Sequence, residues 1–255
     1  CAAEAGKDKG SHKLPPEQIV ALCDGAPALD WRGPAQCAAA VSKVKDRDWL
    51  HGASGLAHRT ALCRGTVSTD PAACVAALPK GTKFGASDSI ALCAGVAPGT
   101  GALVGGCAAA VSKLPLASRP TTEETVLVCG NANATATTVS VQRGAFERGA
   151  LAGGLDGPVK CLKAAASTSV RTEMTSMDRA RLCAGASDDG PSKCVSGIKG
   201  RTKYEVEQLL KLCQTYPLAT LEPTEVAACV NAAAPTMAAD LRVVLCRKRA
   251  GSNGG

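Results

Sequence analysis

The stretch Ala21-Leu22-Cys23-Asp24-Gly25, followed by a second cysteine at Cys37, decides the fold. The same phrase recurs three times, as Ala61-Leu62-Cys63-Arg64-Gly65 to Cys74, Ala91-Leu92-Cys93-Ala94-Gly95 to Cys107, and Arg181-Leu182-Cys183-Ala184-Gly185 to Cys194. Two looser copies run from Cys129 to Cys161 and from Cys213 to Cys229. Similar segments about 30 to 54 residues apart indicate an internal repeat.

Each copy predicts two short helices joined by a loop. In the third copy, Ser87 is placed to cap a helix that ends near Cys93. Gly95 suits the left-handed conformation that ends a helix. The run of helix formers from Cys107 to Lys113 then predicts a second helix, which stops before Pro115.

The same start signals occur in the other copies. Thr121 and Glu124 have the spacing of a capping box, and Ser176 and Thr236 precede the helices to the next cysteines. Prolines suited to a first helical turn precede the second cysteine of four copies: Pro34, Pro71, Pro158 and Pro191. Each second cysteine is therefore expected just inside a helix.

The chain has fourteen cysteines, an even number that predicts a disulfide framework. The two cysteines of one copy are expected on either side of a single turn, which suits the Cα separation of a disulfide. The predicted pairs are Cys23 with Cys37, Cys63 with Cys74, Cys93 with Cys107, Cys129 with Cys161, Cys183 with Cys194, and Cys213 with Cys229. The alternative links the second cysteine of one copy to the first cysteine of the next.

Both ends of the chain resemble halves of a repeat. Cys1-Ala2-Ala3 resembles the start of a second helix such as Cys37-Ala38-Ala39, and Leu245-Cys246 resembles the end of a first helix. These half-units predict a junction disulfide between Cys246 of one subunit and Cys1 of the next, or continuation into a longer repetitive polypeptide. The alternatives are a Cys1–Cys246 bond within one chain, free terminal thiols, and a lipid anchor on Cys1.

The expected fold is all-α: an α-solenoid of about six disulfide-linked helical hairpins, with complementary half-units at the two ends. It is similar only in arrangement to Sel1-like cysteine-rich repeats, because the aromatic and Gly-Tyr positions of that family are missing. We expect one array over 1–255, made of a half-unit at 1–13, repeats at 14–45, 46–80, 81–115, 116–172, 173–200 and 201–234, and a half-unit at 235–255.

Composition points to an oxidising compartment. Six aromatic residues and an Ala-rich apolar content leave little area to bury, so disulfides would supply much of the stability. Such bonds persist in extracellular or secreted proteins.

Zinc is disfavoured because no CxxC occurs, and no apolar run or signal peptide indicates a membrane span or leader. The net charge of +7 is scattered, without the interleaved aromatics that would favour nucleic acid.

No residue pattern predicts catalysis. His12, His51 and His58 are the only histidines, and none lies in a nucleophile, metal or acid–base motif. His51 and His58 are seven residues apart and could share a helix face in a packing role. We therefore expect neither an enzyme nor a cofactor or metal site.

The fourth copy contains an insertion at about 130–157. Insertions in repeat arrays emerge on one face, where partners can bind, although a plain surface loop fits equally. Asn133 is an N-glycosylation acceptor within it. Residues that could carry O-linked sugars are Thr137, Thr138, Ser167, Thr168 and Ser169.

These features predict a secreted structural repeat protein, a subunit or segment of an extracellular fibre, sheath or surface appendage that assembles head to tail with itself. The alternative is an extracellular binding or adhesion solenoid, which would recognise a glycan or protein through its concave face or the 130–157 insertion. A small-molecule or lipid carrier is disfavoured, because regular hairpins do not enclose one pocket.

Overall fold

The computed structural model describes most of the chain, and its described secondary structure is entirely helical. The residues described are 1–5, 14–26, 31–80, 84–115, 119–138, 156–166, 170, 173–186, 188–214, 223–234 and 236–251. Among them, side chains are not described at 53, 131–138, 223–224 and 247–251. The all-α fold class is confirmed for this part of the chain.

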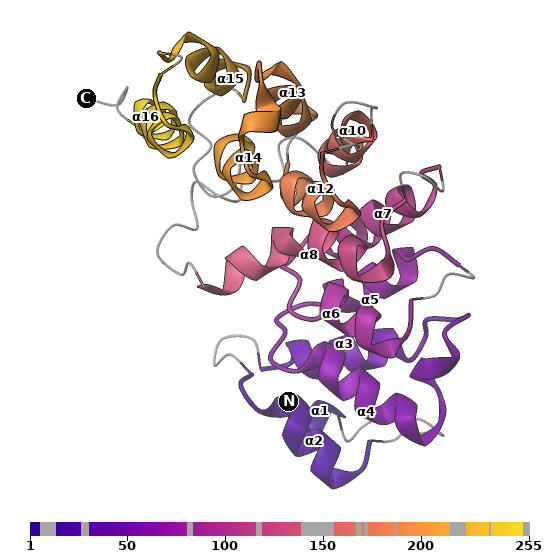
Figure 1. Cartoon of the computed structure of the whole chain (residues 1–255). Helices are drawn as coiled ribbons and strands as arrows, with labels where there is room; N and C mark the ends of the chain where they lie inside the picture. Colours follow the sequence, from indigo (N-terminus) through magenta and orange to yellow (C-terminus); the bar gives the residue numbers. More distant parts are fainter. Residues whose placement is uncertain are drawn as a thin grey trace. The chain divides into compact units, whose positions relative to one another are not determined.

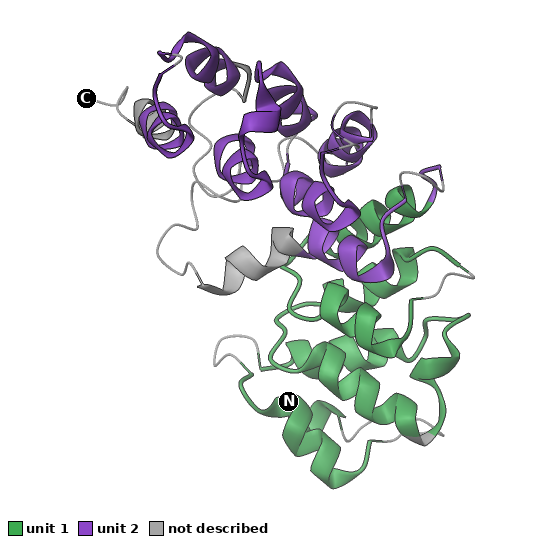
Figure 2. Cartoon of the chain, in the orientation of Figure 1, with its two compact units in different colours: residues 1–112, 133–140 green, residues 113–132, 141–255 purple. Residues whose placement is uncertain are grey.

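The chain divides into two compact units, which Figure 2 colours separately. Unit 1 comprises 1–112 and 133–140, and unit 2 comprises 113–132 and 141–255. The single array expected over 1–255, with its repeat boundaries, stays a prediction, because each unit is described by itself.

Two rows of helices make up unit 1 (Figure 1). We call the helices that carry a first cysteine first-arm helices and those that carry a second cysteine second-arm helices. Each row packs in chain order, α1 on α3 on α5 on α7 and α2 on α4 on α6. The second-arm row is α1 (Ala2–Ala5), α3 (Gly33–Val41), α5 (Asp70–Ala77) and α7 (Gly101–Ser112), and the first-arm row is α2 (Pro16–Cys23), α4 (Gly52–Cys63) and α6 (Ala86–Cys93), with the 3-10 helix η1 (Asp48–Leu50) before α4.

Unit 2 repeats the two-row arrangement. Its second-arm helices pack as α10 on α13 on α15, and its first-arm helices as α12 on α14 on α16. The bounds are α8 (Thr122–Thr138), α10 (Asp156–Ala165), α12 (Ser176–Cys183), α13 (Gly190–Gly197), α14 (Val206–Cys213), α15 (Pro223–Ala232) and α16 (Ala239–Gly251), with η3 (Arg201–Lys203) before α14.

Most helix ends follow the expected signals. Gly95 has φ +69°, and the corresponding glycines at 25, 65 and 185 also have positive φ, so the chain turns directly after the first cysteine. The capping box is confirmed, since Glu124 N donates to Thr121 Oγ1 (3.2 Å) and Thr121 N to Glu124 Oε2 (2.7 Å). Pro34, Pro71 and Pro191 lie in the first turns of α3, α5 and α13, as expected.

The expected cap at Ser87 is wrong. Helix α6 already begins at Ala86, and its N-cap is Gly85, whose N–H donates to Asp88 Oδ2 (3.4 Å). Ser87 therefore lies inside the first turn. In α12 the N-cap is Thr175, one residue before Ser176, and its hydroxyl oxygen accepts from Asp178 N (3.2 Å).

Small residues allow the second-arm helices of unit 1 to approach each other closely. A Cβ on Gly101 would overlap the backbone of Asp70, and one on Gly105 would overlap the Cys74 carbonyl oxygen and Ala77. Because α5 and α7 meet backbone to backbone, the chain builds a dense interior with few aromatic side chains.

Candidate functional site

The cysteines form disulfides between second-arm and first-arm helices. In every pair recorded here, the second cysteine of one predicted copy is joined to the first cysteine of the following copy. The Cα atoms lie 5.5–5.7 Å apart in the pairs Cys1–Cys23, Cys37–Cys63, Cys74–Cys93, Cys161–Cys183, Cys194–Cys213 and Cys229–Cys246. Cys107 and Cys129 are disulfide-bonded as well.

The predicted pairing within each copy is therefore wrong. The incorrect pairs are Cys23 with Cys37, Cys63 with Cys74, Cys93 with Cys107, Cys129 with Cys161, Cys183 with Cys194, and Cys213 with Cys229. The alternative pairing, between successive copies, is the one observed.

Side-chain direction, rather than chain distance, selects the partner. Changing the partner of Cys23 from Cys37 to Cys1 lengthens the closed loop from 14 to 22 residues. Loop-closure entropy changes by only about 0.4 kcal/mol over that range, so it cannot decide the pairing. The second cysteine also lies deeper than expected: Cys37 is the fifth residue of α3, more than a full turn from the helix start.

The expected junction disulfide is also wrong. Cys1 is bonded to Cys23 and Cys246 to Cys229, so neither is available to a neighbouring subunit. The disulfide-linked element therefore begins with a second-arm helix and ends with the following first-arm helix. In this frame Cys1 and Cys246 belong to complete disulfide-linked pairs, not to half-units.

A disulfide framework of this density fits a secreted or extracellular protein, because such bonds persist in oxidising compartments. Within the described residues, no helix has both the length and the hydropathy needed to cross a bilayer.

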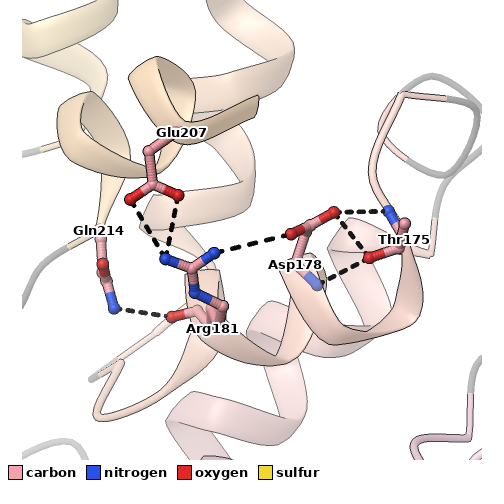
Figure 3. A network of polar contacts seen from close by, with 5 residues as sticks. All are labelled: Thr175, Asp178, Arg181, Glu207 and Gln214. Atoms are coloured by element: carbon pink, nitrogen blue, oxygen red, sulfur yellow. Dashed lines mark hydrogen bonds and ion pairs between the residues drawn. The ribbon is translucent and has the colours of Figure 1, made fainter. Parts of the chain in front are cut away.

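Polar side chains connect successive first-arm helices. In unit 2, Arg181 of α12 donates through Nη2 to both carboxylate oxygens of Glu207 in α14 (3.0 and 3.2 Å) (Figure 3). The Nε2 group of Gln214 donates to the Arg181 carbonyl oxygen (2.8 Å). In unit 1, Asp24 and Arg64 form an ion pair at different positions, directly after the ends of α2 and α4. These half-exposed contacts link neighbouring first-arm helices within each unit.

Asp70 makes a more buried contact between two successive second-arm helices of unit 1, α5 and α7. Its carboxylate accepts N–H groups of Gly99 and Gly101 (both 2.9 Å) at the start of α7, and the Ser68 hydroxyl (2.8 Å). Burial raises the pKa of Asp70, but the donations from Gly101, Gly99 and Ser68 together outweigh it and hold the pKa below its ordinary value. The carboxylate thus fixes the N-terminus of α7 on α5.

Arg47 closes the C-terminal end of α5. Its Nη2 group donates to the carbonyl oxygens of Leu78 (2.7 Å) and Pro79 (3.3 Å), although Arg47 lies 31 residues earlier in the chain. Burial lowers the pKa of the Arg47 guanidinium. This long-range contact joins the loop before α4 to the helix end of α5, which no local motif indicates.

The histidines show no catalytic arrangement among the described residues. His58 Nδ1 lies 2.8 Å from the Trp49 carbonyl oxygen, and its ring packs edge-on against the Trp49 ring at 5.7 Å. His51 lies just before α4, so the two do not share a helix face; His12 is outside the described residues. In the part of the chain that the structure covers, His, Cys, Asp and Glu side chains form no cluster suited to a metal ion.

The proposed partner-binding insertion at 130–157 falls mostly outside the described residues. Helix α8 runs through Thr138, so Asn133, Thr137 and Thr138 lie within a helix whose side chains there are not described. Residues 139–155 and the predicted O-glycosylation sites Ser167, Thr168 and Ser169 lie outside the described residues.

Two first-arm helices, α2 and α16, carry exposed apolar side chains. The residue before the first cysteine is at most 4% exposed at Leu22, Leu62, Leu92, Val128, Leu182 and Leu212, whereas Leu245 in α16 is 41% exposed. On the same helix Leu241 is 61% and Val244 51% exposed. In α2, Val20 is 70% exposed. These exposed faces were not predicted from the sequence. The predicted repeat treated Cys1 and Cys246 as the unpaired features of the chain, so the faces of α2 and α16 were not considered.

Comparisons with known proteins found no match. No protein-family model, no curated protein and no solved structure matches the chain.

Proposed function

We propose that this chain is a secreted structural repeat protein: an α-solenoid of disulfide-linked helical hairpins that forms a subunit or segment of an extracellular fibre, sheath or surface appendage. The observation that carries the proposal is the disulfide register. Each recorded bond joins successive copies of the repeat, so covalent links run from one copy to the next within each unit.

The interior of each unit supports a scaffold role. Leucines before the first cysteines are buried in α2, α4, α6, α12 and α14, and the small residues of α5 and α7 bring these two second-arm helices into close contact. In a repeat array each element contacts its neighbours, and the array grows by addition of equivalent elements. Such an arrangement suits a load-bearing or spacing role.

The head-to-tail assembly we propose is non-covalent. Since Cys1 and Cys246 are both bonded within the chain, no thiol at either end is left to join subunits. Assemblies should therefore dissociate in detergent without reductant and migrate as a single 25.6 kDa chain.

The test is analytical ultracentrifugation and negative-stain electron microscopy of the oxidised chain over a range of concentrations. Linear assemblies that grow with concentration are expected. A species that stays monomeric up to millimolar concentration, with no filaments, would remove the self-assembly function.

A further inference from the structure

We infer that the Cys161–Cys183 disulfide of unit 2 is a redox-sensitive link, which a dithiol reductant opens before the other buried disulfides matched to it below. The reason is the Ser192 hydroxyl, whose Oγ lies 3.3 Å from Cys161 Sγ and 3.9 Å from Cys183 Sγ. Ser192 is 2% exposed, so its hydroxyl is shielded from bulk water. This inference does not rest on the proposed structural function.

Four disulfides are equally buried and can be compared directly. Each of their cysteines is at most 2% exposed, so a reductant reaches the sulfur atoms only when the surrounding helices open. At equal opening, the rate of reduction depends on the groups that touch the sulfur atoms. The four bonds are Cys37–Cys63, Cys74–Cys93, Cys161–Cys183 and Cys194–Cys213.

Among these four, only the Cys161–Cys183 bond has a hydroxyl at the equivalent place. The residue two before the cysteine of a second-arm helix lies against the cysteine of the preceding second-arm helix. The Ser192 hydroxyl of α13 donates to the Cys161 carbonyl oxygen of α10 (2.8 Å), and a Cβ on Gly105 of α7 would lie 2.3 Å from the Cys74 carbonyl oxygen of α5. The residues at this place beside the other three bonds are Ala72, Gly105 and Ala227, none of which has a polar side-chain atom.

The Ser192 hydroxyl can stabilise the charge that develops during reduction. A thiolate of the reductant attacks Cys183 Sγ, the Sγ–Sγ bond breaks, and its electron pair leaves on Cys161 Sγ. Rotation of the Ser192 O–H then turns the proton from the neutral Cys161 carbonyl oxygen to the Cys161 thiolate without moving a heavy atom. A hydrogen bond to an ionised acceptor is about twice as strong as one to a neutral acceptor. The hydroxyl therefore lowers the barrier to cleavage of this bond.

The second thiol of the reductant completes the exchange. As a thiolate it attacks the reductant's own sulfur in the mixed disulfide and releases Cys183 as a thiolate. Two electrons have then passed from the dithiol to the protein, the reductant leaves as a cyclic disulfide, and its two protons end on Cys161 and Cys183. Helices α10 and α12 lose their covalent link, while Cys194–Cys213 still joins α13 to α14.

Partial reduction of the folded chain tests the inference. Dithiothreitol is added, free thiols are alkylated at intervals, and peptide mass spectrometry gives a rate for each bond. Ser192→Ala should slow reduction of Cys161–Cys183 by about 3- to 10-fold, the difference between a charge-assisted and a neutral hydrogen bond. A purely structural role for Ser192 predicts the opposite sign, because loss of its contact with Cys161 would loosen α13 on α10 and expose the bond sooner.

Ala227→Ser is the matched variant that adds a hydroxyl. Ala227 of α15 is 5% exposed and lies opposite Gly197 of α13, where the missing Cβ leaves room for one oxygen atom. This variant should speed reduction of Cys194–Cys213 by a similar factor and leave the rate at Cys161–Cys183 unchanged. Amide exchange in α10, α13 and α15 measures helix opening in each variant, so that rates are compared at equal opening.

The outcomes decide the role of Ser192. At equal opening, slower reduction of Cys161–Cys183 in Ser192→Ala supports the inference. An unchanged or faster rate in that variant overturns it, and so does earlier reduction of any of the other three bonds in the unmodified chain. Self-assembly is measured separately on the oxidised chain, so failure of one proposal leaves the other standing.

Discussion

Removing the Cys37–Cys63 disulfide offers the most direct test of the repeat frame. Both cysteines are fully buried, and the bond closes a loop with a sequence separation of 26. The chain-entropy relation for a loop of that size gives about 3.5 kcal/mol of stabilisation at 25 °C. The double variant Cys37→Ala/Cys63→Ala should therefore lose about that much free energy of unfolding in unit 1, measured by urea denaturation of the oxidised protein.

Thiol counting in denaturant makes the same variant decisive about pairing. Cys37→Ala/Cys63→Ala should show no free thiol, because both partners of one bond are gone. The matched control Cys23→Ala/Cys37→Ala should show two, since Cys1 and Cys63 lose their partners. The reverse result, two thiols in the first variant and none in the control, would refute the pairing between successive copies and restore pairing within each copy.

Three further changes probe packing, titration and capping. Gly105→Ala should destabilise the chain by about 1–3 kcal/mol in a thermal melt, because the added Cβ would overlap the Cys74 carbonyl oxygen. The control Gly85→Ala should cost much less, because a Cβ there meets no atom closer than 3.9 Å. The pKa of Asp70 is lower in the folded chain than in the unfolded one, so the Asp70 carboxylate stabilises the fold above about pH 4, and this stabilisation is lost as the pH falls through the folded pKa. Asp70→Asn should therefore lower the free energy of unfolding by about 1 kcal/mol at pH 7. A plot of that free energy against pH should show a smaller decrease at acid pH for the variant than for the unmodified chain. Thr175→Ala should cost about 1 kcal/mol through loss of the α12 cap, visible as faster amide exchange in its first turn.

The sequence predicted local structure well and long-range pairing poorly, for a physical reason. Gly95, Pro34 and the Thr121–Glu124 pair act on their own backbone, so their effects can be inferred from spacing alone. A cysteine partner depends on the direction in which a helix presents its Cβ, which turns by about 100° from each residue to the next. Spacing could not show that Cys37 faces the next first-arm helix.

Contacts that span a whole copy were equally hidden. Arg47 reaches carbonyl groups 31 residues away, and Asp70 accepts N–H groups 29 and 31 residues away. Neither residue belongs to a motif, since each is defined by the helix that packs against it. The exposed apolar face of α16 could have been suspected from Leu241, Val244 and Leu245, which are spaced as one side of a helix.

The disulfide register also determines how the chain responds to tension. A pulling force passes directly through each bond, so the segments between bonded cysteines, such as 37–63 and 74–93, bear no load while the bonds are intact. Only the connections outside those loops can lengthen, and the longest of them, 129–161, spans 32 residues. The 63–74 connection spans 11 residues and reaches about 40 Å when fully extended. An oxidised chain under load therefore yields in steps whose lengths are limited by these connections, while a reduced one can unravel along its whole length.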